Sequence, residues 1–354
     1  MATAFADLHE PAGTGEEFLA APDPPAPAPA SRAAPPAAAG RRPNPLAARL
    51  AAMAKGLVAP VLGIAAFLAL WAALAPQVDT SLGALPGPAE VAGQGASLFE
   101  EWSAARQAEA AFYARQEASN AAVIAAGDAG AVREFDYAGP PTFVDQILTS
   151  IETVALGFVL ATLVAVPIGL VCGLSPLVNA AINPLVQIMK PVSPLAWLPI
   201  VTMVVSATIT SADPVLAKSF VISAIVVMLC SLWPTLINTA IGAASIDKDL
   251  INVGRVLKLG WFAKLTRLVL PSALPYIFTG MRLSLGVGWM VLIAAEMLAQ
   301  NPGLGKFVWD EFQNGSSQSL ARIMFAVVVI GLIGFGLDRL MMGLQALASK
   351  NRTV

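Results

Sequence analysis

Long apolar runs separated by polar stretches dominate the chain. A helix needs about 20 apolar residues to cross roughly 30 Å of hydrocarbon. Six runs reach that length, at residues 56–75, 147–173, 185–209, 219–241, 272–299 and 320–345. The pattern therefore predicts an all-α integral membrane protein with six transmembrane helices.

Two of the predicted spans contain residues that interrupt an apolar helix. The third span contains Pro191, Pro194 and Pro199. Because proline removes a backbone hydrogen bond, we expect this span to be kinked or partly unwound. The sixth contains Asp338 and Arg339, so its inner end is predicted to lie near this pair.

Outside the spans, two segments differ in composition. Residues 1–45 are dominated by Ala and Pro, which favours an extended, solvated chain, and we predict a disordered tail. Residues 76–146 form an acidic insert before the core domain, residues 147–345. Within the insert, residues 97–126 lack Pro and Gly and are rich in helix formers. This predicted helix either packs on the outer face of the membrane domain or offers a docking platform for another subunit.

Composition supports a lipid environment and narrows the chemistry. Hydrophobic residues make up 56% of the chain and charged residues 12%, whereas soluble domains carry about a quarter charged residues. The net charge of −2 gives no basic field for nucleic acid. The only histidine, His9, lies in the tail, and both cysteines lie in apolar runs. No histidine-based metal site is therefore expected, and no cofactor is predicted for this chain.

The distribution of Lys and Arg predicts the orientation. Basic residues precede the first span, occupy the connection at 242–271 and follow the last span, whereas the insert has three arginines against ten acidic residues. Cytoplasmic connections of membrane proteins carry the excess of Lys and Arg. Both termini and the 242–271 loop are therefore predicted to be cytoplasmic, and the insert is predicted to lie outside.

The 242–271 loop combines charge with helical periodicity. Leu250, Val253 and Leu257 form an apolar stripe, and Asp247 precedes the run as a candidate N-cap. The pattern predicts a short amphipathic helix over residues 247–262. Such a helix either docks into a cleft on a soluble partner or rests on lipid.

The same loop resembles a family signature. Permeases of binding-protein-dependent ABC importers carry Glu-Ala-Ala, three residues, Gly, nine residues, then Ile-x-Leu-Pro. Here the triplet falls on Asn252–Gly254, the glycine on Lys258 and the end on Leu268–Pro271. The spacing is kept, while the Glu and the central Gly are replaced, and we expect Gly260 to supply the flexibility of the turn.

Four further segments resemble the nitrate-type branch, which also includes taurine and bicarbonate systems. They are KPVSPLAWLPI (190–200), SLWPTLINTAIGAASI (231–246), GMRLSLGVGWMVLIAAEML (280–298) and GLGKFVWDEF (303–312). The resemblance implies the type I ABC importer permease fold in the bacterial inner membrane. It also implies a second permease copy, cytoplasmic ABC ATPase subunits and a periplasmic solute-binding protein.

The chain contains no Gly-x4-Gly-Lys-Ser/Thr phosphate loop, so the partner ATPase is expected to use the ATP. The predicted coupling residues are Asp247, Leu250, Asn252, Gly254, Leu257, Lys258, Leu259 and Gly260. By resemblance the solute is nitrate or nitrite, with taurine or other sulfonates, bicarbonate and cyanate as alternatives. A stand-alone channel or secondary transporter is the competing class.

Three ionisable residues in the spans are candidates for the translocation path. Glu296 either forms an outer gate or reaches the membrane interface. Arg282 and Lys190 fall in the cytoplasmic half. They either favour an anion leaving inward or extend toward lipid phosphates.

Overall fold

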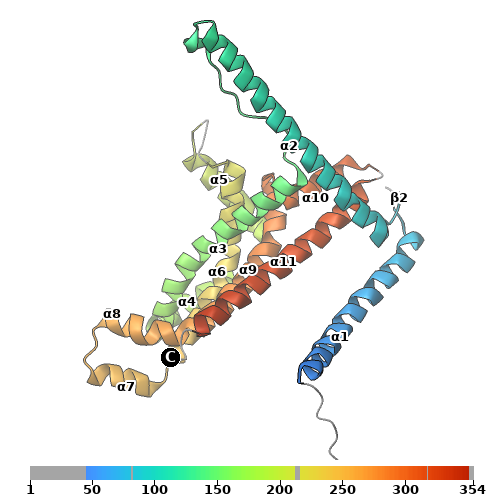
Figure 1. Ribbon diagram of the computed structural model, residues 1–354. Helices are drawn as coiled ribbons and strands as arrows, with labels where there is room; N and C mark the ends of the chain where they lie inside the picture. The colour runs from blue at the N-terminus through green and yellow to red at the C-terminus, as the bar shows by residue number, and fades with distance from the viewer. Residues whose placement is uncertain (1–44, 81–82, 212–215, 317, 351–354) are drawn as a thin grey trace, which may run out of the picture. The chain divides into compact units, whose positions relative to one another are not determined.

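The computed structural model describes residues 45–80, 83–211, 216–316 and 318–350, which are almost entirely helical (Figure 1). The predicted disordered tail, up to residue 44, lies outside these ranges. The helices are α1 (Pro45–Leu74), α2 (Pro88–Ala125), α3 (Phe143–Leu174), α4 (Pro176–Met189), α5 (Pro194–Thr208), α6 (Lys218–Ala244), α7 (Lys248–Val256), α8 (Trp261–Lys264), α9 (Leu270–Ala299), α10 (Leu304–Asn314) and α11 (Ser319–Lys350).

Shorter elements complete the chain. Two strands, β1 (Asp79–Thr80) and β2 (Gly83–Ala84), pair antiparallel. There are 3-10 turns at Ala75–Gln77 and Ala129–Ala131, and a π-helical segment at Leu265–Val269. The chain divides into two compact units, Met1–Val61 and Leu62–Val354. In the first, the described residues form the opening part of α1, and the second contains all other described elements.

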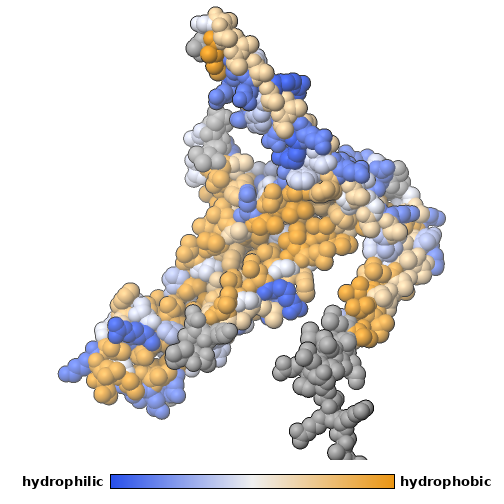
Figure 2. All heavy atoms as spheres, viewed as in Figure 1, coloured by the Kyte–Doolittle hydropathy of each residue, from blue (hydrophilic) through white to orange (hydrophobic). Residues whose placement is uncertain are grey.

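Five helical stretches are long and apolar enough to cross a membrane. They are Val58–Gln77, Phe143–Leu174, Lys218–Ala244, Trp261–Ala299 and Ser319–Ala348. Helices α4 and α5 pass the same test only as a pair, which is bent by 102°, so the number of crossings is six if this pair forms one broken span and five if it forms a re-entrant loop. Apolar side chains cover the middle of the face shown in Figure 2, with polar groups gathered toward α2 at one end. The predicted all-α membrane architecture is confirmed, with five continuous candidate spans and one bent pair of helices in the described residues.

The break between α4 and α5 falls in the proline-rich segment. Lys190 caps the end of α4, and Ser193 begins α5 by accepting a hydrogen bond from the Leu195 N–H at 3.3 Å. Pro194 occupies the first turn of α5, where its missing N–H has no intrahelical partner to lose. The halves contain 14 and 15 residues, or about 21 and 22 Å at 1.5 Å per residue. Neither half is long enough to cross the hydrocarbon alone.

Helices α3, α6 and α9 form the centre of the bundle, and their backbones approach closely. A Cβ atom on Gly169 of α3 would lie 2.7 Å from the Leu236 carbonyl oxygen of α6. One on Gly280 of α9 would lie 2.9 Å from Thr235 Cα of α6. Such small-residue contacts are the usual basis of tight helix packing in membranes. The Ser284 and Thr235 hydroxyls, 2.7 Å apart, add a buried hydrogen bond between α9 and α6.

Helix α11 continues past Asp338 and Arg339 to Lys350, and the location of the span's inner end near this pair stays a prediction. The Asp338 carboxylate is paired across the bundle with Arg282 of α9, whose Nη2 lies 3.0 Å from Asp338 Oδ2. A compensated charge of this kind need not terminate a helix inside the membrane.

Helix α2 begins at Pro88 rather than near residue 97. The sequence pattern missed its first turns because Gly93 and Gly95 are poor helix formers. Tertiary contacts hold this part: Leu98 is buried in the core, and Glu101 pairs with Arg322 of α11 at 2.6 Å.

The outer part of α2 is accompanied by the returning chain. Asn120 donates to the Arg133 carbonyl at 2.9 Å, and Gln116 accepts from the Phe135 N–H at 2.9 Å. The beginning of α2 therefore packs on the membrane domain, while its end is hydrogen-bonded to residues 133–135, which have no regular secondary structure.

Candidate functional site

The loop between α6 and α9 is built around the short helix α7. Asp247 begins the helix, because its carboxylate accepts a hydrogen bond from the Asp249 N–H at 2.9 Å. Asp249 in the first turn and Arg255 in the last complement the helix dipole. Asn252 is exposed on α7 and accepts a long hydrogen bond from Arg255 Nη1 at 3.4 Å.

The helix stops at Val256 because the chain enters a left-handed turn at Lys258, whose φ is 50°. The Leu259 N–H bonds to the Gly254 carbonyl and the Lys258 N–H to the Arg255 carbonyl, each at 3.0 Å. This pair of bonds is the Schellman ending, in which the left-handed residue is usually glycine. In the resemblance described above, Lys258 stands at the position of the signature glycine, and here it adopts the left-handed conformation itself.

Two predictions for this loop are therefore wrong. The single helix expected over 247–262 is instead α7, a tight turn and α8, since the left-handed residue ends the first helix. Gly260 does not supply the flexibility of the turn, because its φ of −62° is open to any residue. The strained position is Lys258, two residues earlier.

One side of the loop is anchored to the bundle. Gly254 is buried, and a Cβ atom there would lie 2.8 Å from Leu268 Cδ1. Ile251 packs on a cluster made by Ile246, Val269 and neighbouring residues of α6 and α9. The loop is thereby fixed to both helices that it connects.

The other side of the loop exposes large apolar side chains. Leu257 is 63% exposed, whereas Leu250 is 42% exposed and Leu259 is half-buried. The exposed set, which we call the apolar tip, consists of Val253, Val256, Leu257, Trp261 and Phe262. Figure 2 shows apolar and polar groups intermixed at this end of the molecule. The sequence pattern pointed to Leu257 but missed Val256 and Phe262, which lie outside the i, i+3, i+4 stripe.

Arg282, one of the candidate path residues, is already paired. Its guanidinium forms a two-pronged ion pair with Asp338 of α11. Asp338 was predicted only as an interruption, although an acidic residue in the next span was an available signal for a partner. The Arg282 charge is therefore largely compensated within the chain.

Glu296 lies in a sealed polar cluster where α3, α9 and α10 meet. Its carboxylate is 0% exposed. Ser150 Oγ lies 2.8 Å from both carboxylate oxygens, and the Gly305 N–H donates to Oε2 at 3.0 Å. The Ser150 hydroxyl also accepts from the Leu304 N–H at 2.8 Å.

Of the two alternatives for Glu296, the structure shows the hydrogen bond to a neighbouring helix and not a side chain that reaches the membrane interface, and a role as an outer gate stays a prediction. The carboxylate instead holds the first turn of α10 against α3 and α9. Gly305 allows the close approach, because it packs directly against Glu296 and the Ile293 carbonyl. In this structure Glu296 joins three helices.

Lys190, the third candidate, is exposed in the break between α4 and α5. No ion pair holds it within the described parts of the chain. Of the three candidates, Arg282 is paired with Asp338, Glu296 is enclosed in a polar cluster, and Lys190 is exposed.

The similarity to known proteins includes the helical bundle and the 242–271 loop described above. Residues 165–350 match the family of binding-protein-dependent transport system inner membrane components. The nitrate import permease protein NrtB of Synechococcus elongatus is 37% identical over 204 residues, which is 58% of this chain and 69% of that protein. The bicarbonate transport system permease protein CmpB of the same organism is 34% identical over 299 residues, 84% of this chain and 91% of that protein. The taurine transport system permease protein TauC of Escherichia coli is 32% identical over 215 residues, 59% and 72% respectively.

Proposed function

The chain belongs to the family of binding-protein-dependent transport system inner membrane components, and on this premise we propose that its cargo is nitrate. As a family member it is the permease subunit of an ABC importer, a multi-pass component that works with an ATPase and a solute-binding protein. Two identical copies are proposed to form the complete path.

Support for nitrate comes from NrtB, the nitrate permease that is 37% identical to this chain. The aligned region, 204 residues long, is about the size of the core domain. This similarity is the observation that carries the choice of solute.

We propose further that the apolar tip docks into a cleft on the ATPase. Two observations support this docking. The apolar tip is exposed beside charged residues, and the loop that carries it is anchored to α6 and α9 through Gly254 and Ile251. Trp261 begins a helical stretch that runs to Ala299 without a gap. A displacement imposed on the tip is therefore passed into α9, because the hydrogen-bonded helix resists compression.

The solute is tested in proteoliposomes that contain the permease, its ATPase and its binding protein. When ATP is supplied, labelled nitrate should accumulate in the compartment that holds the ATPase. An excess of taurine or bicarbonate should not reduce this uptake of nitrate. In cells, deleting the gene should abolish growth on low nitrate and leave growth on taurine intact. Taurine-dependent growth loss with normal nitrate growth would reassign the cargo to sulfonates.

Bicarbonate is the second candidate for a specific reason. The alignment with CmpB covers 299 residues, which is longer than the core domain and must therefore extend into the insert. ATP-dependent uptake of labelled bicarbonate with no uptake of nitrate would favour this alternative.

A further inference from the structure

Helix α4 carries a row of polar side chains along one face. Asn179, Asn183 and Gln187 follow one another at intervals of four residues, and Lys190 lies three residues further. At 3.6 residues per turn these four fall within an arc of about 80° and extend over about 17 Å. The set Asn179, Asn183, Gln187 and Lys190 is called the polar row below.

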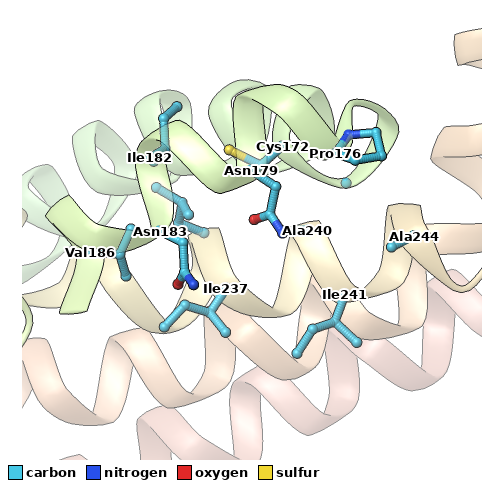
Figure 3. A pocket seen from close by; sticks show the side chains of 12 residues that line it. Cys172, Pro176, Asn179, Ile182, Asn183, Val186, Ile237, Ala240, Ile241 and Ala244 are labelled. Atoms are coloured by element: carbon cyan, nitrogen blue, oxygen red, sulfur yellow. The ribbon is translucent and has the colours of Figure 1, made fainter.

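The polar row lies in apolar surroundings, where unpaired polar groups are costly and point to a function. Asn179 and Asn183 line a cavity of about 340 Å³ between α3, α4 and α6. Figure 3 shows both amides directed from α4 toward α6. Most other lining residues are apolar, including Ile237 and Ile241. All four members of the row are exposed in the single chain.

The charge of this region favours an anion. The 12 residues that line the cavity include no charged side chain, and Gln187 and Lys190 lie beyond its lining on the same face of α4. Arg282 is compensated by Asp338, and Glu296 is enclosed by Ser150 and Gly305, so neither is free to serve an ion in transit. Lys190 is left as the open charge among the three candidates.

The amides below Lys190 supply N–H donors without a full positive charge. Gln187 and Asn183 are linked to one another at 3.3 Å, which orders part of the row. A conduction path needs contacts strong enough to admit the ion and weak enough to release it. Neutral amides following one cation meet both conditions for a small oxoanion.

The depth of the polar row follows from its packing. Pro176 and Ala244 line the same cavity, so the row starts beside the inner end of α6. Val186 packs with Leu232 and Leu236, near the middle of α6. The row therefore extends from the end near the 242–271 loop to the α4–α5 break, about half-way through the span.

We propose that the polar row is the inner half of the translocation path, in which Lys190 receives the anion at the break and the amides of Gln187, Asn183 and Asn179 pass it toward the cytoplasm. The direction of transport and the identity of the anion rest on the proposed function. The position of the path rests only on the row and its cavity.

Water access tests the path without assuming a solute. In the complete complex, with Cys172 and Cys230 replaced by Ala, single cysteines at Asn179, Asn183 and Gln187 are exposed to sulfonatoethyl methanethiosulfonate from the ATPase side. Cysteines at Leu185 and Ile188 are the matched controls, since both are exposed on the opposite face of α4. The row should react at least tenfold faster than the controls. Equal rates, as in a lipid-filled groove, would overturn the proposal.

Import tests the chemistry of the same residues. Asn183→Asp is isosteric and adds a negative charge, so anion uptake should fall at least tenfold while loaded binding protein still stimulates ATP hydrolysis. Asn183→Ser keeps a donor and should import within about threefold of the original chain. Normal uptake by Asn183→Asp would also overturn the proposal. If the unmodified complex imports bicarbonate but not nitrate, the proposed cargo is wrong. The import test of the polar row is then carried out with labelled bicarbonate, and the accessibility test is unchanged.

Discussion

Replacing Leu257 with aspartate should uncouple the permease from its ATPase. Leu257 lies in the apolar tip, on a loop that is fixed to the bundle through Gly254, which packs on Leu268, and through Ile251. Because the side chain is exposed, the substitution removes little packing within the chain. Membrane insertion and the fold of the bundle are therefore expected to stay normal.

The magnitude follows from the exposed fraction. Fully burying a leucine side chain contributes about 1.5–3 kcal/mol. With 63% of Leu257 still exposed, docking has about 1–2 kcal/mol left to gain from it. Aspartate forfeits that gain and adds a desolvated charge, which costs several kcal/mol when unpaired. The sum exceeds about 4 kcal/mol, or roughly a thousandfold in affinity.

The assay measures retention of the ATPase on affinity-purified permease, together with ATP-driven uptake. Ile124→Asp is the matched control, since Ile124 is 56% exposed on α2, outside the candidate membrane spans. Val256→Asp changes the 81% exposed neighbour of Leu257 and should repeat its effect. If both tip variants keep normal ATPase retention and uptake, the tip rests on lipid and the docking proposal is wrong.

Three further predictions concern other parts of the chain. Lys258→Gly should stabilise the loop by about 1 kcal/mol, because the left-handed conformation is costly for any residue with a Cβ, and limited proteolysis of the loop should slow. Ser150→Ala should remove about 2–5 kcal/mol by leaving the Leu304 N–H and a buried carboxylate each short of a partner. The thermal midpoint should then be lower than that of the half-buried control Ser103→Ala. A cysteine at Ser103 should react with a membrane-impermeant maleimide in intact cells, and a residue reachable only after permeabilisation would reverse the predicted topology.

The spans could be predicted because the length of an apolar run is a local property of the sequence. The same holds for the break near Pro191, which follows from local backbone chemistry. The partners of the charged residues could not be predicted in this way. Arg282 meets Asp338 across 56 residues and Glu296 meets Ser150 across 146, and only the packing of α3, α9 and α11 brings these pairs together.

The end of α7 was missed for a different reason. When a helix ends at a left-handed glycine, the glycine itself predicts the end from the sequence. Here Lys258 occupies the left-handed position, so the sequence contains no such signal. Likewise, the first turns of α2 contain glycines that local propensity scores as unfavourable, and the burial of Leu98 compensates for them. In both places the tertiary structure overrides the residue preference.

The close approach of α3, α6 and α9 has a mechanical consequence. Where Gly169 and Gly280 bring backbone against backbone, no layer of flexible side chains remains to be sheared, so these three helices resist sliding past one another. Compliance is then concentrated where the helical hydrogen bonding is interrupted, at the α4–α5 bend. The three central helices are thus expected to move together, and the main place where the bundle can bend lies beside Lys190.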